Sequence, residues 1–78
     1  MRIKHINMNM TELELQDGTL VLFSYQTPVA SFRDGKFYKT SRSWSKTTSR
    51  HINKWIAGHV DQCYLEQQEY FDNLVKGI

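Results

Sequence analysis

Two Asp-Gly pairs limit the fold most strongly, because each of them separates two runs of β-type residues. Asp-Gly is favoured at the centre of a type I′ hairpin turn, where both residues take a positive φ. Pro28 cannot donate to a sheet ladder, so it marks a break or an edge between the two hairpins. The pairs are Asp17-Gly18, between runs 11–16 and 19–25, and Asp34-Gly35, between runs 29–33 and 36–40.

The hydrophobic period changes in the second half of the chain. Ile52, Trp55 and Ile56 follow the spacing i, i+3, i+4 of one helix face, which predicts a helix from near Thr48 to near Ala57. Thr47 or Thr48 is expected to cap its N-terminus, since a hydroxyl satisfies a free N–H of the first turn. A second helix is predicted over residues 66–76.

These elements predict an α+β fold. We expect an antiparallel β-sheet of about four strands, with hairpins at Asp17-Gly18 and Asp34-Gly35, followed by two helices packed on one face. Residues 3–7 can add a strand at the sheet edge. The 78 residues form a single domain, residues 1–78, which is mainly β over 1–46 and mainly α over 47–78.

The amino-acid composition indicates the environment in which the protein is expected to reside. The lone cysteine, Cys63, allows no internal disulfide and fits a reducing compartment, so we expect a cytoplasmic protein. No apolar stretch is long enough to span a membrane, and no membrane partner is expected. The small core is compatible with a homodimer.

The charge is unevenly distributed along the chain. Residues 31–59 carry seven Lys or Arg and one acidic residue, whereas residues 60–78 carry four acidic residues and one Lys. An asymmetry of this kind favours an interaction surface.

The residues that could perform catalysis or bind a metal are scattered. His51, His59 and Cys63 lack the paired spacing of a zinc site. No glycine pattern of a nucleophile elbow surrounds a serine, and the four glycines form no phosphate cradle. We therefore predict no catalytic residue, no metal site, no cofactor and no enzymatic activity.

The segment from Phe37 to Trp55 is the strongest candidate for binding. Basic residues recur there every three or four positions, with hydroxyl and aromatic residues between them. Phe37, Ile52 and Trp55 are expected in the core. Arg50 and Lys54 face either a partner or the acidic second helix. The residues predicted to bind a partner are Arg42, Trp44, Lys46, Arg50, Asn53 and Lys54.

Direct binding of nucleic acid is the alternative, because Arg and Lys contact phosphates and exposed aromatic rings stack on unpaired bases. The residues predicted for that role are Lys36, Tyr38, Lys39, Arg42, Arg50 and Lys54.

The sequence also resembles a family of short, uncharacterised proteins of bacteriophages and mobile elements. The resemblance lies in VLFSYQTPVA at residues 21–30, YKT at 38–40 and WSKTTSRHINKW at 44–55. It implies a small accessory protein in the cytoplasm of a host bacterial cell. The predicted function is thus binding of a host protein or ribonucleoprotein, with anti-CRISPR-type inhibition of host defence as one such role and direct nucleic-acid binding as the alternative.

Overall fold

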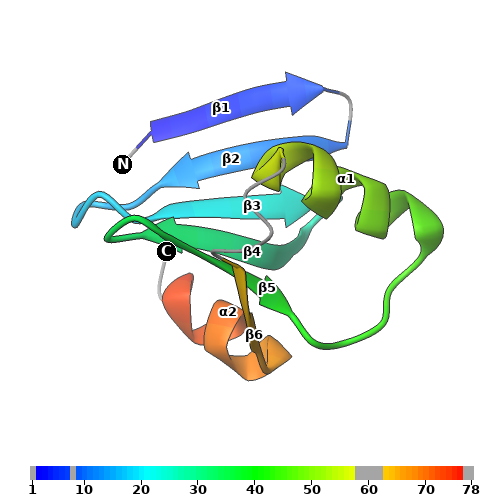
Figure 1. Cartoon of the computed structure of the whole chain (residues 1–78). Helices are drawn as coiled ribbons and strands as arrows, with labels where there is room; N and C mark the ends of the chain where they lie inside the picture. The colour runs from blue at the N-terminus through cyan, green and yellow to red at the C-terminus, as the bar shows by residue number, and fades with distance from the viewer. Residues whose placement is uncertain (1, 8, 58–62, 77–78) are drawn as a thin grey trace.

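The computed structural model describes residues 2–7, 9–57 and 63–76. Six strands and two helices lie within these ranges (Figure 1). The strands are β1 (Arg2–Asn7), β2 (Met10–Glu14), β3 (Leu20–Ser24), β4 (Thr27–Arg33), β5 (Lys36–Thr40) and β6 (Cys63–Glu66), and the helices are α1 (Lys46–Ile56) and α2 (Gln68–Leu74). The α+β class predicted from the sequence is confirmed.

Both predicted hairpins are present, but their turns differ. Asp34 and Gly35 have φ values of 53° and 77°, as a type I′ turn requires. At the first hairpin only Gly18 has a positive φ, of 90°, and its N–H donates to the carbonyl of Leu15. The prediction of a type I′ turn there is wrong, because Asp17 accepts the N–H of Thr19 and closes a longer loop.

The sheet is larger than predicted and is mixed. Its order is β1-β2-β3-β4-β5-β6, with antiparallel neighbours except for the parallel pair β5 and β6. The prediction of about four antiparallel strands is therefore wrong, and the mainly helical second half also contains a strand. A parallel neighbour needs a crossover connection, and α1 lies within it.

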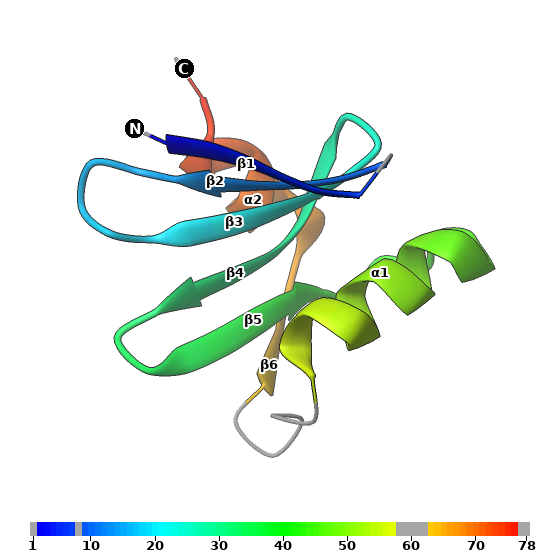
Figure 2. The same cartoon turned by 90° about the horizontal axis from the view of Figure 1, so that it is seen from above.

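The two helices pack against opposite faces of the sheet, which corrects the expectation that they share one face. Adjacent residues of a strand point to opposite faces. On β5, Phe37 packs edge-on against Trp55 of α1, whereas Tyr38 packs against Tyr70 of α2. Figure 2 shows α1 and α2 on the two sides of the sheet.

Each face has its own apolar core. On the α1 face, Met10 and Leu22 pack with Ile52 and Ile56 of the helix. On the α2 face, Phe71 is fully buried. Neither helix in the described ranges has the length and apolar character needed to cross a membrane.

Candidate functional site

Helix α1 is fixed at both ends by its own residues. Ser45 is the N-cap, and its hydroxyl accepts the N–H of Thr48. The expectation that Thr47 or Thr48 caps the helix is therefore wrong by two or three residues. The helix ends at Ala57, which takes a left-handed conformation and donates its N–H to the carbonyl of Asn53.

A polar cluster, buried at Ser24 and Thr48 and half-buried at His51, holds α1 against β3. The hydroxyl of Ser24 lies 3.0 Å from the Thr48 hydroxyl and 2.8 Å from Nδ1 of His51. Ser24 is only 2% exposed, so its hydroxyl is out of reach of a substrate. A third hydrogen bond, 2.8 Å from Nε1 of Trp55 to Oε1 of Glu12 on β2, holds the C-terminal end of the helix. These bonds fix which face of α1 points outward.

The outward face of α1 is basic. Lys46, Arg50 and Lys54 are all exposed and lie four residues apart. The ion pair found among the described residues joins Arg33 to Asp34, at 3.6 Å, so the α1 cations have no carboxylate partner there. The acidic second helix does not supply one, because α2 lies across the sheet (Figure 2).

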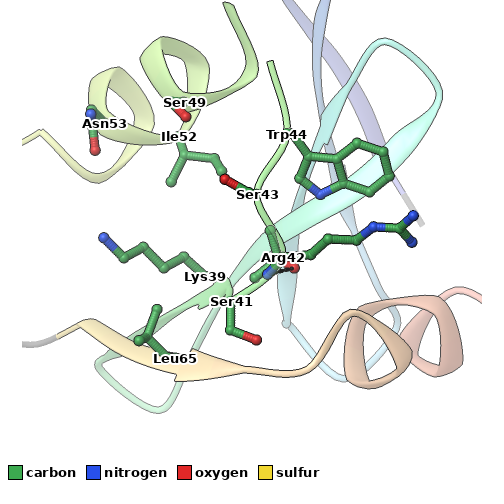
Figure 3. Close-up of a pocket in the computed structure, with 10 residues that line it drawn as sticks. Lys39, Ser41, Arg42, Ser43, Trp44, Ser49, Ile52, Asn53 and Leu65 are labelled. Atoms are coloured by element: carbon green, nitrogen blue, oxygen red, sulfur yellow. Dashed lines mark hydrogen bonds between the residues drawn. The ribbon is translucent and has the colours of Figure 1, made fainter. Parts of the chain in front are cut away.

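A pocket of about 300 Å³ lies beside α1, between the helix, the loop after β5 and strand β6 (Figure 3). Its hydroxyl groups come from Thr40, Ser41, Ser43 and Ser49, its amide from Asn53 and its cations from Lys39 and Arg42. Ile52 and Leu65 add apolar wall, and Leu65 is 62% exposed. Hydrogen-bond donors and positive charge dominate this lining, so the pocket suits an anionic group.

Trp44 also borders the pocket, but its ring already has partners. The guanidinium of Arg42 lies 4.6 Å from the ring centroid, a cation–π contact. The ring Nε1 donates to Oε1 of Gln68, which also accepts the hydroxyl of Thr40. In Figure 3 the side chains of Arg42 and Trp44 lie together on one side of the loop, and Lys39 extends on the other. Trp44 thus has a structural role that sequence reasoning did not assign.

The structure brings the predicted partner-binding residues to one region. Arg42, Trp44 and Asn53 border the pocket. The remaining three, Lys46, Arg50 and Lys54, follow one another along the outer side of α1 next to it.

The residues predicted for nucleic acid are divided between two faces. Lys39 is on the α1 face, where it lines the pocket, and Arg50 and Lys54 lie on the outer side of α1. Arg42 covers the Trp44 ring on the other side of the loop from Lys39. Tyr38 lies on the α2 face with Tyr64 and Tyr70, and the Nζ of Lys36 is 6.0 Å from the Tyr64 ring. A single nucleic-acid surface therefore excludes Lys36 and Tyr38.

Sequence reasoning missed the serines of the pocket. Ser49 could have been found, because it precedes Asn53 by four residues and so shares its side of α1. Ser41, Ser43 and Leu65 meet α1 only through the tertiary fold.

No group of three or more metal-ligand side chains exists within the ranges that the structure describes. His59 lies outside them. Burial raises the pKa of the Cys63 thiol, and the nearby Lys39 opposes this shift.

The comparisons with known proteins give a family but no activity. Residues 1–73 match a family of unknown function (DUF8033), so the chain belongs to that family. Comparisons with curated proteins and with solved structures gave no match.

Proposed function

We propose that this member of the DUF8033 family is a non-enzymatic accessory protein that binds a host macromolecule through α1 and the adjacent pocket. The macromolecule that the geometry supports best is nucleic acid. The supporting observation is the set of exposed cations on α1 with no carboxylate partner among the described residues. Ordinary surfaces intersperse charges of both signs, whereas α1 from Lys46 to Ile56 contains no acidic residue at all.

The surroundings of these cations support the same function. Lys39 of β5 and Arg42 of the following loop also line the pocket, together with the hydroxyls of Ser41 and Ser43 from that loop and of Ser49 from α1. Lys, Arg and Ser side chains are the usual donors to phosphate oxygens. The surface therefore offers both charge and hydrogen bonds to a phosphate backbone.

Fluorescence anisotropy with labelled oligonucleotides, single-stranded and duplex, tests this function across a salt series. We expect binding at low salt. The logarithm of the association constant should fall linearly with the logarithm of the salt concentration, because phosphate contacts release counterions. A variant with Lys46, Arg50 and Lys54 changed to Gln should lose most of the affinity. Lys36→Gln, on the opposite face, is the matched control and should bind as the wild type does. Absence of binding to every probe at low salt would reject the function.

A second candidate, binding of a host protein or ribonucleoprotein, is favoured by the exposed apolar residues of β6. Tyr64 and Leu65 are 50% and 62% exposed on this short strand at the sheet edge, and Leu65 also lines the pocket. Unpaired strand edges and exposed apolar side chains are common in protein interfaces. In the phage or plasmid setting that the sequence resemblance implies, we propose that binding of such a partner inhibits a CRISPR-type defence of the host.

This second candidate has a separate test. The chain is expressed in bacteria that carry an active CRISPR system, and plaque formation by a targeted phage is counted. Inhibition predicts restored plaques with the wild type and fewer with Leu65→Ser. Ile3→Ser, which changes an exposed apolar residue on the opposite edge strand, should behave as the wild type does. Unrestored plaques with all three proteins would count against a defence inhibitor.

A further inference from the structure

The outward face of α1 consists of side chains that donate hydrogen bonds. Arg50 lies near the middle of this face, Asn53, three residues further on, lies at its pocket edge, and Lys46 and Lys54 lie on either side of Arg50 along the helix. All four are exposed. At a rise of about 1.5 Å per residue, the successive basic residues stand about 6 Å apart along the axis. The face therefore has a centre suited to recognition and two charged ends.

We propose that α1 enters the major groove of duplex DNA, where Arg50 and Asn53 contact base edges and Lys46 and Lys54 contact the flanking phosphates. This inference rests on the proposed nucleic-acid function and names its substrate class. The major groove, about 12 Å wide, admits an α-helix. Arg pairs in a bidentate manner with guanine, and Asn does so with adenine, so these two residue types can read sequence there.

The way α1 is held suits a helix that reads bases. Its inner side is anchored by buried Ile52 and Ile56 and by the bonds from Thr48 to Ser24 and from Trp55 to Glu12. In Figure 1 α1 lies in front of β2 and β3, and none of the labelled elements crosses its outer side. A helix already ordered and oriented in this way loses little conformational entropy when it binds.

Two features of the α1 side favour duplex DNA over other partners. Single-stranded nucleic acid is held by stacking on exposed aromatic rings, but the Trp44 ring is covered by Arg42 and bonded to Gln68. Protein interfaces centre on apolar or aromatic anchors. None of the large apolar side chains exposed in the described ranges, Ile3, Tyr25, Tyr64 and Leu65, belongs to α1 itself. Tyr25 and Leu65 lie beside the helix, Tyr25 at 6.0 Å from the His51 ring and Leu65 in the pocket, and neither is on its outward face.

The test is selection from a library of duplex DNA with a randomised core, with the full chain at low salt, followed by affinity measurement. We expect an enriched short motif that contains adjacent guanine and adenine positions. Arg50→Ala and Asn53→Ala should each lower the preference for one base of the motif by about 10-fold or more, as loss of one bidentate contact implies. Lys46→Gln and Lys54→Gln should weaken binding to all duplexes alike and lower the salt slope by about one each.

Several results would overturn this inference, and they differ from failure of the proposed function. Equal binding of all duplexes, unchanged in Arg50→Ala and Asn53→Ala, would show that α1 does not read bases although the protein binds DNA. Tighter binding of a single strand than of its duplex would exclude the groove as well. Absence of binding to either form would reject the function and the inference together. Circular dichroism of each variant verifies that it is folded, and Lys36→Gln on the opposite face should retain the motif and its affinity.

Discussion

Gln68 is the residue that ties the loop after β5 to α2. Its Oε1 accepts from Thr40 and Trp44, and its Nε2 donates to the carbonyl of Pro28 at 2.7 Å. Gln68→Ala removes this partner from Trp44 Nε1 and the Pro28 carbonyl, while the Thr40 hydroxyl still accepts the N–H of Arg42. An unsatisfied buried group costs about 1–3 kcal/mol. We therefore expect Gln68→Ala to lower the free energy of unfolding by about 2 kcal/mol, measured by urea denaturation.

The neighbouring Gln67 is a matched control for this substitution. It is exposed, and its side chain makes no cap hydrogen bond to α2. Gln67→Ala should change the free energy of unfolding by less than about 0.5 kcal/mol. Equal losses in both variants would show that helix propensity, rather than the bonds of the Gln68 amide, sets the effect.

Asp17 gives the protein a contribution to stability that depends on pH. Hydrogen bonding to Thr19, chiefly to its backbone N–H at 2.9 Å, lowers the pKa of the Asp17 carboxyl below its ordinary value of 3.8. A carboxyl with a lowered folded-state pKa stabilises the fold above its ordinary pKa, and this contribution is lost as the pH falls through the lowered value.

Asp17→Asn isolates this contribution, because Asn keeps an oxygen that accepts the same bond but does not titrate. We expect the Tm of the wild type to fall relative to that of Asp17→Asn between about pH 5 and pH 2. Thermal unfolding of both proteins over that range measures the difference. A constant difference in Tm across the range would contradict the role given to the carboxylate.

At the scale of elements, local signals made the hairpins and α1 predictable, and long-range pairing made β6 unpredictable. Asp-Gly pairs and apolar spacing act within a few residues of each element. Residues 63–66 show no clean alternation, and they form a strand only because β5 lies beside them in register, from Phe37 opposite Cys63 to Thr40 opposite Glu66. Without β6, no local pattern indicates that the two helices lie on opposite faces of the sheet.

The candidate site, too, was predictable where it depends on local spacing and unpredictable where it depends on long-range contacts. The cations of α1 could be predicted, because helical spacing puts Lys46, Arg50 and Lys54 on one side. The role of Trp44 could not, because its partner Gln68 is distant in sequence and belongs to an element on the other face. Pro28, predicted to mark a break or an edge, instead lies within the interior strand β4, next to an irregularity in the strand register. Its carbonyl accepts a hydrogen bond from Gln68.

The C-terminal cap of α1 is suboptimal. Ala57 has φ 53° and ψ 47°, a left-handed conformation that a residue with a Cβ adopts at a cost of about 1 kcal/mol. Glycine has no such cost and is favoured at this position. Ala57→Gly should therefore raise the free energy of unfolding by about 0.5–1 kcal/mol, as measured by urea denaturation. Ser49→Gly, in the body of the same helix, is the control and should lower it by a similar amount. Destabilisation by both would mean that the end of α1 does not hold the left-handed conformation.

At the scale of the whole molecule, each face of one sheet depends on one helix. Met10, Leu22 and Val29 are covered from the α1 side, while the buried Phe71 of α2 lies across the sheet. β3 is a central strand, and it contributes Leu22 to one face and Val21 to the other. Because the two cores share this strand, loss of either one is expected to unfold the entire chain rather than half of it.

Substitution of Phe71 tests this coupling, because within the described part of α2 Phe71 is the only buried residue. A Phe→Ala change in a core costs about 3–5 kcal/mol, and a chain of 78 residues is expected to have a total stability of about 4–12 kcal/mol. Phe71→Ala should therefore remove about a quarter or more of that stability. The His51 and Thr48 resonances of α1 in the folded NMR spectrum should then be lost at a urea concentration at which the wild type keeps them. Phe71→Leu should retain them, and Tyr64→Ala, at a half-exposed ring on the same face, should have a much smaller effect. Unaltered α1 resonances in a Phe71→Ala protein whose α2 has melted would show that the two faces fold independently.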